Sequence, residues 1–161
     1  MVMRANIRLI KKGLLLLWAV WFCLAGLSNI ADGLKAVSLL PDAWPFASAN
    51  YALIAELSVR YHAPQWFVAT LFASVIAWEL YAAWLFWRAF IHCAAFGCIG
   101  STSMDRAIAV SLTLWGAFVI ADELLIAYAI EQAHRQLLGL ELITVLFLEL
   151  VPEQKSGLHE G

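Results

Sequence analysis

Four apolar stretches constrain this chain more than any other feature of its sequence. They cover residues 13–31, 65–87, 107–130 and 137–151. The first has no charged residue, and a helix of its length extends about 28 Å, close to the roughly 30 Å thickness of a hydrocarbon core. The chain is also 63% hydrophobic and only 14% charged, whereas soluble domains are about 45–50% apolar and about 25% charged. The sequence therefore predicts an all-α integral membrane protein.

The connections between these stretches predict how the helices are arranged. Residues 32–64 form the longest connection, and we expect it outside the cytoplasm, while residues 131–136 form a tight turn and residues 152–161 a polar tail. Consecutive spans joined in this way form an antiparallel bundle. We therefore expect residues 1–161 to form a single membrane domain, a four-transmembrane-helix antiparallel bundle.

Part of the long connection has the pattern of an amphipathic helix. Over residues 49–61, Leu53 and Leu57 recur at helical spacing, whereas Glu56 and Arg60 form an i,i+4 pair on the other side. Such a helix is typical of a membrane surface. The sequence predicts an interfacial helix between the first and second spans.

The positive charges predict an orientation, because cytoplasmic loops carry an excess of Lys and Arg. With the amino terminus inside, seven of the 10 basic residues are cytoplasmic. Both termini are therefore expected in the cytoplasm. The cytoplasmic set is Arg4, Arg8, Lys11, Lys12, Arg88, Arg106 and Lys155, and the outer set is Lys35, Arg60 and Arg135.

Several functional classes lack support in the sequence. A net charge of -2 disfavours nucleic acid as a partner, which would need a basic face. We find no haem-attachment or nucleotide motif and no nucleophile constellation, so a catalytic role has no candidate residues. The spacing of Cys93 and Cys98 does not fit a C-x-x-C site. We interpret these two and Cys23 as small hydrophobes or exposed thiols.

Two adjacent acids, Asp122 and Glu123, lie inside the third apolar stretch. A charge at the centre of a membrane helix costs about 2.5–3.5 kcal/mol on insertion scales, so such residues usually face protein, water or an ion. Counted from the inner surface, Asp122 lies about 22 Å along the helix, in the outer leaflet. Glu79, in the second span, is a separate intramembrane acid nearer the inner surface. The expected outer pocket contains Asp122, Glu123, Glu131, His134, Glu141 and His62.

Only one of the adjacent acids can face the bundle interior, because neighbouring residues on a helix point about 100° apart. Glu123 shares a stripe with Gly116 and Ala127, small residues that permit close helix approach. Asp122 shares its stripe with Trp115. We therefore predict that Glu123 faces inward and that Asp122 faces a neighbouring helix, a partner subunit or water.

Glu131 and His134 have the Glu-x-x-His spacing of ligand pairs in di-iron bundles. A divalent metal site would need further ligands, and Glu131 could equally pair with Arg135 at i,i+4. A structural or partner-pairing role, a metal site and proton handling all stay open for this pair.

The first apolar stretch resembles a known family. Residues 14–35, with Leu24-Ala25-Gly26-Leu27-Ser28-Asn29-Ile30 before a polar break, are similar to the opening helix of bacterial four-span proteins of the DoxX and MauE kind. Asn29 stands where that pattern usually has a basic residue. The resemblance implies a bacterial inner membrane and an accessory role around electron transfer, and it assigns no functional residue.

Three functions are therefore expected. The first is a non-catalytic accessory or assembly subunit of a larger membrane complex, with redox complexes included among the candidates. The second is a quinone-associated redox protein that uses the outer pocket. The third is a cation or proton transporter with Glu79, Glu123 and Glu141 as intramembrane carboxylates. The lipid bilayer is the expected environment, with other membrane subunits or further copies of the chain as partners.

Overall fold

The computed structural model describes residues 2–98 and 101–151, with side chains from Ile7 onward. This part of the chain is helical, as predicted, and contains five helices. The polar tail predicted at 152–161 and Lys155 lie outside the described residues. The helices are α1 (Val2–Ala36), α2 (Asn50–Val59), α3 (Gln65–Phe96), α4 (Thr102–Leu125) and α5 (Tyr128–Leu150).

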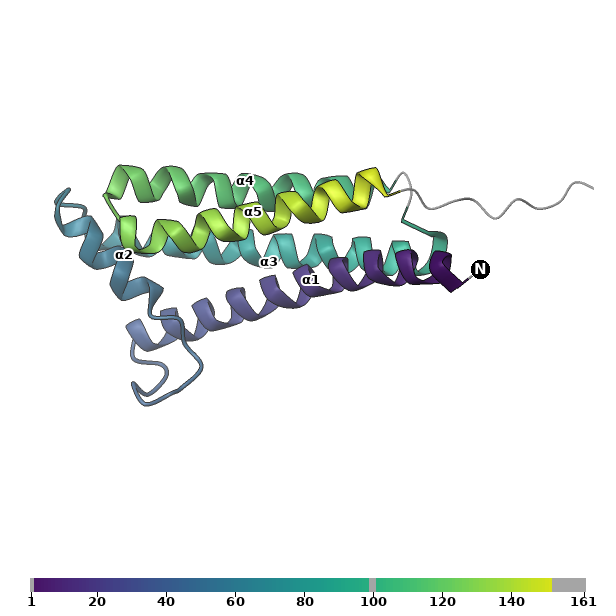
Figure 1. Ribbon diagram of the computed structural model, residues 1–161. Coiled ribbons are helices and arrows are strands. Elements are labelled where there is room, and N and C mark those ends of the chain that lie inside the picture. Colours follow the sequence, from purple (N-terminus) through teal and green to yellow (C-terminus); the bar gives the residue numbers. More distant parts are fainter. Residues whose placement is uncertain (1, 99–100, 152–161) are drawn as a thin grey trace, which may run out of the picture.

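The four long helices lie side by side, and α2 crosses one end of them (Figure 1). Helix α3 packs on both α1 and α4, and α5 packs mainly on α4 with a smaller contact to α1. The amino terminus lies at the end opposite α2 (Figure 1). Helix α2 contacts α1 and α3, so the long connection folds back over the helix ends.

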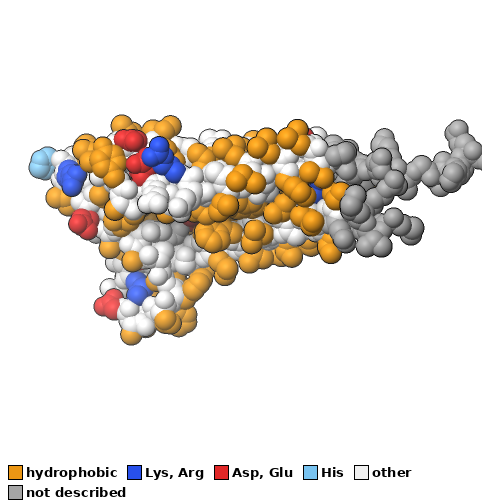
Figure 2. Space-filling model, viewed as in Figure 1, with side chains coloured by type: hydrophobic (Ala, Val, Ile, Leu, Met, Phe, Trp, Pro, Cys, Tyr) orange, Lys and Arg blue, Asp and Glu red, His pale blue; other side chains and the backbone are white. Residues whose placement is uncertain are grey.

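Three helices are long and apolar enough to cross a membrane: Ile7–Ala36, Gln65–Phe96 and Thr102–Leu125. Hydrophobic side chains cover the long sides of the molecule, whereas most charged side chains visible in this view gather at the α2 end (Figure 2). These features indicate a membrane protein in contact with lipid. The fourth predicted stretch, 137–151, is not among the three by length and composition.

The turn between the last two helices lies earlier than predicted. We expected it at residues 131–136, but α4 ends at Leu125 and α5 begins at Tyr128. Ile126 adopts a left-handed conformation with φ 55°. A residue in this conformation commonly ends an α-helix, because the chain cannot continue with helical dihedral angles. Because this conformation is usually taken by Gly or Asn, nothing in the sequence marks it.

The predicted amphipathic segment is helical, as α2. Leu53 and Leu57 are partly buried, whereas Glu56 and Arg60 are exposed. This confirms the sides assigned to these four residues. The position of α2 at a membrane surface stays a prediction.

The core is built from aromatic rings contributed by three helices. Phe22 of α1 is completely buried, and its ring lies 5.8 Å from that of Phe86 in α3 and 5.6 Å from that of Trp115 in α4. Trp18 extends this cluster one turn along α1. The packed rings bring the buried polar groups of α4 and α5 against an apolar interior.

Candidate functional site

Asp122 and His134 form an ion-pair contact between α4 and α5. Oδ2 of Asp122 lies 2.6 Å from Nδ1 of His134, and Asp122 is only 4% exposed. Glu123, one residue along, is exposed. The predicted choice of Glu123 as the inward acid is therefore wrong, since Asp122 occupies the buried face.

The error has a physical reason in the residues that share each face. A Cβ added at Gly116 would meet nothing within 4 Å, so the small-residue stripe does not lie at a close helix contact. Trp115, on the stripe of Asp122, is 4% exposed and belongs to the aromatic core. Burial of the Trp115 ring determines which face of α4 points into the core. Asp122 lies on that face and is therefore buried as well.

His134 lies against aromatic rings of α4. Its ring centroid is 4.8 Å from that of Phe118 in a stacked arrangement and 6.3 Å from that of Trp115. Asp122 engages Nδ1, and the other ring nitrogen, Nε2, has no hydrogen-bond partner among the described residues. His134 can therefore donate or accept a further hydrogen bond from one edge of its ring.

Glu141 lies deeper between the same two helices. It is 1% exposed, and Oε1 is hydrogen-bonded to the hydroxyl of Ser111. Oε2 of Glu141 and Nε1 of Trp115 are both buried without a hydrogen-bond partner. Sequence reasoning placed Glu141 in the site but missed Ser111, although a serine in an apolar run is the available signal.

The Glu-x-x-His spacing does not bring Glu131 and His134 to one ligand. Glu131 is buried and pairs with Arg135 at 3.1 Å, whereas His134 pairs with Asp122. In the described part of the chain, no group of three or more His, Cys, Asp or Glu residues is placed to hold a metal ion. The i,i+4 alternative is the one that the geometry favours.

Glu79 belongs to a second polar cluster, between α1 and α3. Its Oε2 accepts a hydrogen bond of 2.7 Å from the side-chain amide of Asn29, whose Oδ1 accepts one of 2.9 Å from Asn50 at the start of α2. Asp32 accepts hydrogen bonds from the hydroxyl of Ser48 and from the backbone N–H of Tyr51. Sequence analysis kept Glu79 apart from the outer pocket but missed Asn29, the polar partner that it has inside the first apolar stretch.

His62 is exposed and contacts none of the acids within the described ranges. Its neighbour Tyr61 donates a hydrogen bond to the backbone carbonyl of Leu124. The segment that follows α2 thus lies against the end of α4. The structure brings together Asp122, His134 and Glu141 along one helix interface, with Glu131 on the same helix, and leaves out Glu123, His62 and Glu79.

Two of the three cysteines are not separate thiols. Cys93 and Cys98 are joined by a disulfide, and both are 1% exposed. Our interpretation of them as exposed thiols is therefore wrong, whereas their place in the buried core agrees with the alternative of small hydrophobes. Cys23 is free, and its sulfur accepts a hydrogen bond of 3.2 Å from Nε1 of Trp87.

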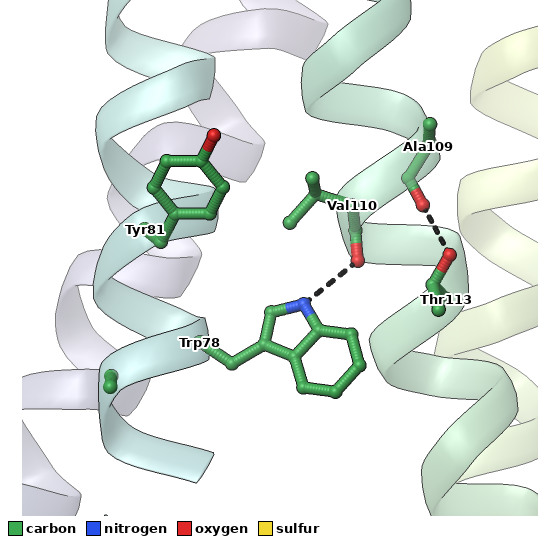
Figure 3. Close-up of a pocket in the computed structure, with 6 residues that line it drawn as sticks. Trp78, Tyr81, Ala109, Val110 and Thr113 are labelled. Carbon is green, nitrogen blue, oxygen red and sulfur yellow. Dashed lines mark hydrogen bonds between the residues drawn. The ribbon is translucent and has the colours of Figure 1, made fainter. Parts of the chain in front are cut away.

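An apolar groove of about 500 Å³ lies between α3 and α4. The indole of Trp78 crosses it and donates a hydrogen bond of 3.2 Å to the carbonyl of Val110 (Figure 3). Tyr81, which lies one turn along α3 from Trp78, is 50% exposed. The lining residues are Ala77, Trp78, Tyr81, Ala109, Val110 and Thr113.

No family model, curated protein or solved structure matches the chain. The functional argument therefore uses the geometry of the chain itself.

Proposed function

We propose that the chain is a four-span bundle in a bacterial inner membrane, with α5 as the fourth span. The charges of α5 make it polar by composition, but Glu131 and Arg135 pair with each other and Glu141 is buried against α4. From residue 140 onward, the exposed side chains of α5 are mostly large and apolar: Leu140, Leu142, Ile143, Leu146 and Leu150. A helix with this surface can face lipid.

The proposed orientation follows from the basic residues. The amino-terminal end of the molecule carries Lys11, Lys12, Arg88 and Arg106, whereas the α2 end carries Lys35, Arg60 and Arg135. The first group is extended by Arg4, Arg8 and Lys155 in the sequence. The charge bias supports placing both termini in the cytoplasm.

Within that membrane, we infer a non-catalytic accessory or assembly role in a larger complex. The observation that carries this proposal is that the contacts between the four long helices differ in their side-chain hydrogen bonds. Asn29 bonds Glu79 between α1 and α3, Trp18 bonds Thr144 between α1 and α5, and both Asp122 and Ser111 of α4 bond side chains of α5. The acids thus have structural partners within the chain.

The contact between α3 and α4 is different from these three. Near its end, the hydroxyl of Ser101 before α4 is hydrogen-bonded to His92 of α3. Along the middle of the two helices, the described side-chain hydrogen bond runs from Trp78 to a backbone carbonyl, and the apolar groove opens beside it. We define this contact, from Trp78 and Tyr81 to Ala109, Val110 and Thr113, as the α3–α4 seam. An apolar groove along a membrane helix pair fits a helix of another subunit, because helices in lipid associate through packing and close approach.

Filling the groove tests this role. Ala109 lines it and is exposed, so Ala109→Trp should occupy the space and remove a stoichiometric partner from the protein isolated by gentle solubilisation. Ile143→Trp on the exposed face of α5 is the matched control. Isolation of the unaltered protein as a single chain without a partner would refute the accessory role.

A second candidate function is favoured by the Asp122–His134 pair. An imidazole held by a carboxylate, stacked on Phe118 and open at Nε2, can exchange a hydrogen bond or proton with a quinone carbonyl or quinol hydroxyl. The resemblance of the first helix to DoxX-like and MauE-like proteins points toward the same chemistry. Quinone in lipid extracts of the purified protein, lost in His134→Ala, would support this candidate instead.

The third expectation, a path for cations or protons, has less support. Its three carboxylates lie in different surroundings: Glu79 between α1 and α3, Glu141 between α4 and α5, and Glu123 on the surface.

A further inference from the structure

A cluster of buried oxygen atoms lies between α4 and α5. The Ser111 hydroxyl is 2.8 Å from the carbonyl oxygen of Ala107 and 3.1 Å from that of Ile108, and it is also hydrogen-bonded to Oε1 of Glu141. Ser111 and Glu141 are 0% and 1% exposed. One hydroxyl group therefore has three oxygen neighbours.

The number of protons decides how this cluster is satisfied. A serine hydroxyl carries one proton, backbone carbonyls carry none, and an ionised carboxylate only accepts. If Glu141 were ionised, the single hydroxyl proton of Ser111 could form a hydrogen bond with only one of the three oxygen atoms. In the other two contacts, two hydrogen-bond acceptors would then face each other without a proton between them. If Glu141 is protonated, its O–H donates to Ser111, and Ser111 donates to the nearer carbonyl, that of Ala107.

The second oxygen of Glu141 gives an independent observation. Oε2 of Glu141 and Nε1 of Trp115 are buried and have no hydrogen-bond partner. The indole N–H is only a donor, and the carbonyl oxygen of a protonated carboxyl group is an acceptor. Trp115 lies one turn along α4 from Ser111. A small movement of the indole N–H toward Oε2 of Glu141, or one bridging water, would therefore give both atoms a hydrogen-bond partner.

The charged groups around Glu141 do not offer it a counter-ion. On α4 and α5, Asp122 is engaged by His134 at 2.6 Å, and on α1 the ammonium group of Lys11 donates to the carbonyl of Leu148 at 2.6 Å. No cation forms a salt bridge with Glu141 in the described residues. An unpaired carboxylate in such surroundings is costly, whereas a neutral carboxyl group with hydrogen bonds is not.

We propose that Glu141 is a buried proton-binding site. The protonated carboxyl group donates a hydrogen bond to the hydroxyl oxygen of Ser111, and its carbonyl oxygen is the acceptor for the indole N–H of Trp115. The ligand is a proton held between α4 and α5. This assignment goes beyond the accessory role and does not depend on a partner protein. It makes the bound proton part of the contact between the last two helices.

Infrared spectroscopy of the purified full chain in lipid nanodiscs at neutral pH tests this site. A protonated carboxyl group has a C=O stretching band that a carboxylate lacks. The spectrum of the unaltered protein minus that of Glu141→Gln should contain this band. Glu149→Gln is the matched control, because Glu149 is exposed on the same helix, and its difference spectrum should contain carboxylate bands instead.

A second variant keeps the test independent of the stability of Glu141→Gln. In Ser111→Ala, the Glu141 O–H loses its acceptor, so the protonated-carboxyl band should shift in frequency while the protein remains folded. Carboxylate bands in the Glu141→Gln difference spectrum, or an unshifted band in folded Ser111→Ala, would overturn the proposal. Neither result would alter the outcome of partner co-purification, so the two proposals can fail separately.

Discussion

The adjacent acids Asp122 and Glu123 provide a matched pair for testing the site. Both are acidic, both lie in the last turn of α4, and they differ in burial, since Asp122 is 4% exposed and Glu123 is exposed. Asp122→Ala removes the 2.6 Å contact with His134. Glu123→Ala removes an acid of the same sign from nearly the same position along the helix.

The expected effect of Asp122→Ala is a loss of about 1–2 kcal/mol in the free energy of unfolding. Hydrogen bonds to charged groups contribute about 1.5–3 kcal/mol in soluble proteins, whereas interhelical bonds in a membrane protein average about 0.6 and reach about 1.7 kcal/mol. The short contact and near-complete burial of Asp122 place it toward the upper part of the membrane range. A change of this size alters the folded-to-unfolded ratio by about 5–30-fold.

Glu123→Ala should change the free energy of unfolding by less than about 0.5 kcal/mol, as is usual for surface substitutions. It could even stabilise slightly, because an acid near a helix C-terminus opposes the helix dipole. Reversible unfolding in mixed micelles, followed by circular dichroism, measures both variants. Equal losses from the two substitutions would refute the assignment of helix faces in the structure.

A double-mutant cycle isolates the contact from other effects of truncation. His134→Ala combined with Asp122→Ala should show a coupling energy, since the two groups touch, whereas His134→Ala combined with Glu123→Ala should be additive. Additivity in the first cycle would show that the ion pair does not contribute to stability.

Two further predictions concern helix packing and orientation. Gly26→Leu should destabilise the protein by about 1–3 kcal/mol in the same assay, because even a Cβ at Gly26 would lie 2.8 Å from Cδ2 of Leu80, while Gly13→Leu should be tolerated because nothing lies within 4 Å there. The structure joins Cys93 and Cys98 by a disulfide, and a cytoplasmic α3–α4 connection should keep this disulfide reduced in growing cells, so that it forms only after oxidation. Alkylation after acid quenching measures this, and a disulfide already present in the cell would reverse the proposed orientation.

Much of the fold follows from simple patterns in the sequence. The apolar stretches predicted the long helices, and the spacing of Leu53 and Leu57 predicted both α2 and the sides of its residues. These patterns succeed because burial of apolar surface is repeated over many residues. The turn at Ile126 was not predictable in this way, because a single residue in the left-handed region, without Gly or Asn, leaves no pattern.

The membership of the candidate site was predictable only in part. Matching depth placed Asp122, His134 and Glu141 near one another, because rise per residue is fixed in any helix. Their partners could not be derived, since rotation of a helix depends on which side chains fill the core. Here the face of α4 that contains Trp115 points into the core, and the face that contains Gly116 does not. Asp122 rather than Glu123 is therefore buried.

The side-chain hydrogen bonds are distributed unevenly over the helix interfaces. Side-chain hydrogen bonds hold α1 to α3, α1 to α5 and α4 to α5, and the aromatic core joins α1, α3 and α4 around Phe22. At the α3–α4 seam, the corresponding bond reaches only a backbone carbonyl. A partner helix that lies in the groove would contact α3 and α4 from outside the molecule and would leave the α1–α3 and α4–α5 interfaces unchanged. The buried acids would then matter to the complex indirectly, by keeping rigid the three contacts that the partner does not touch.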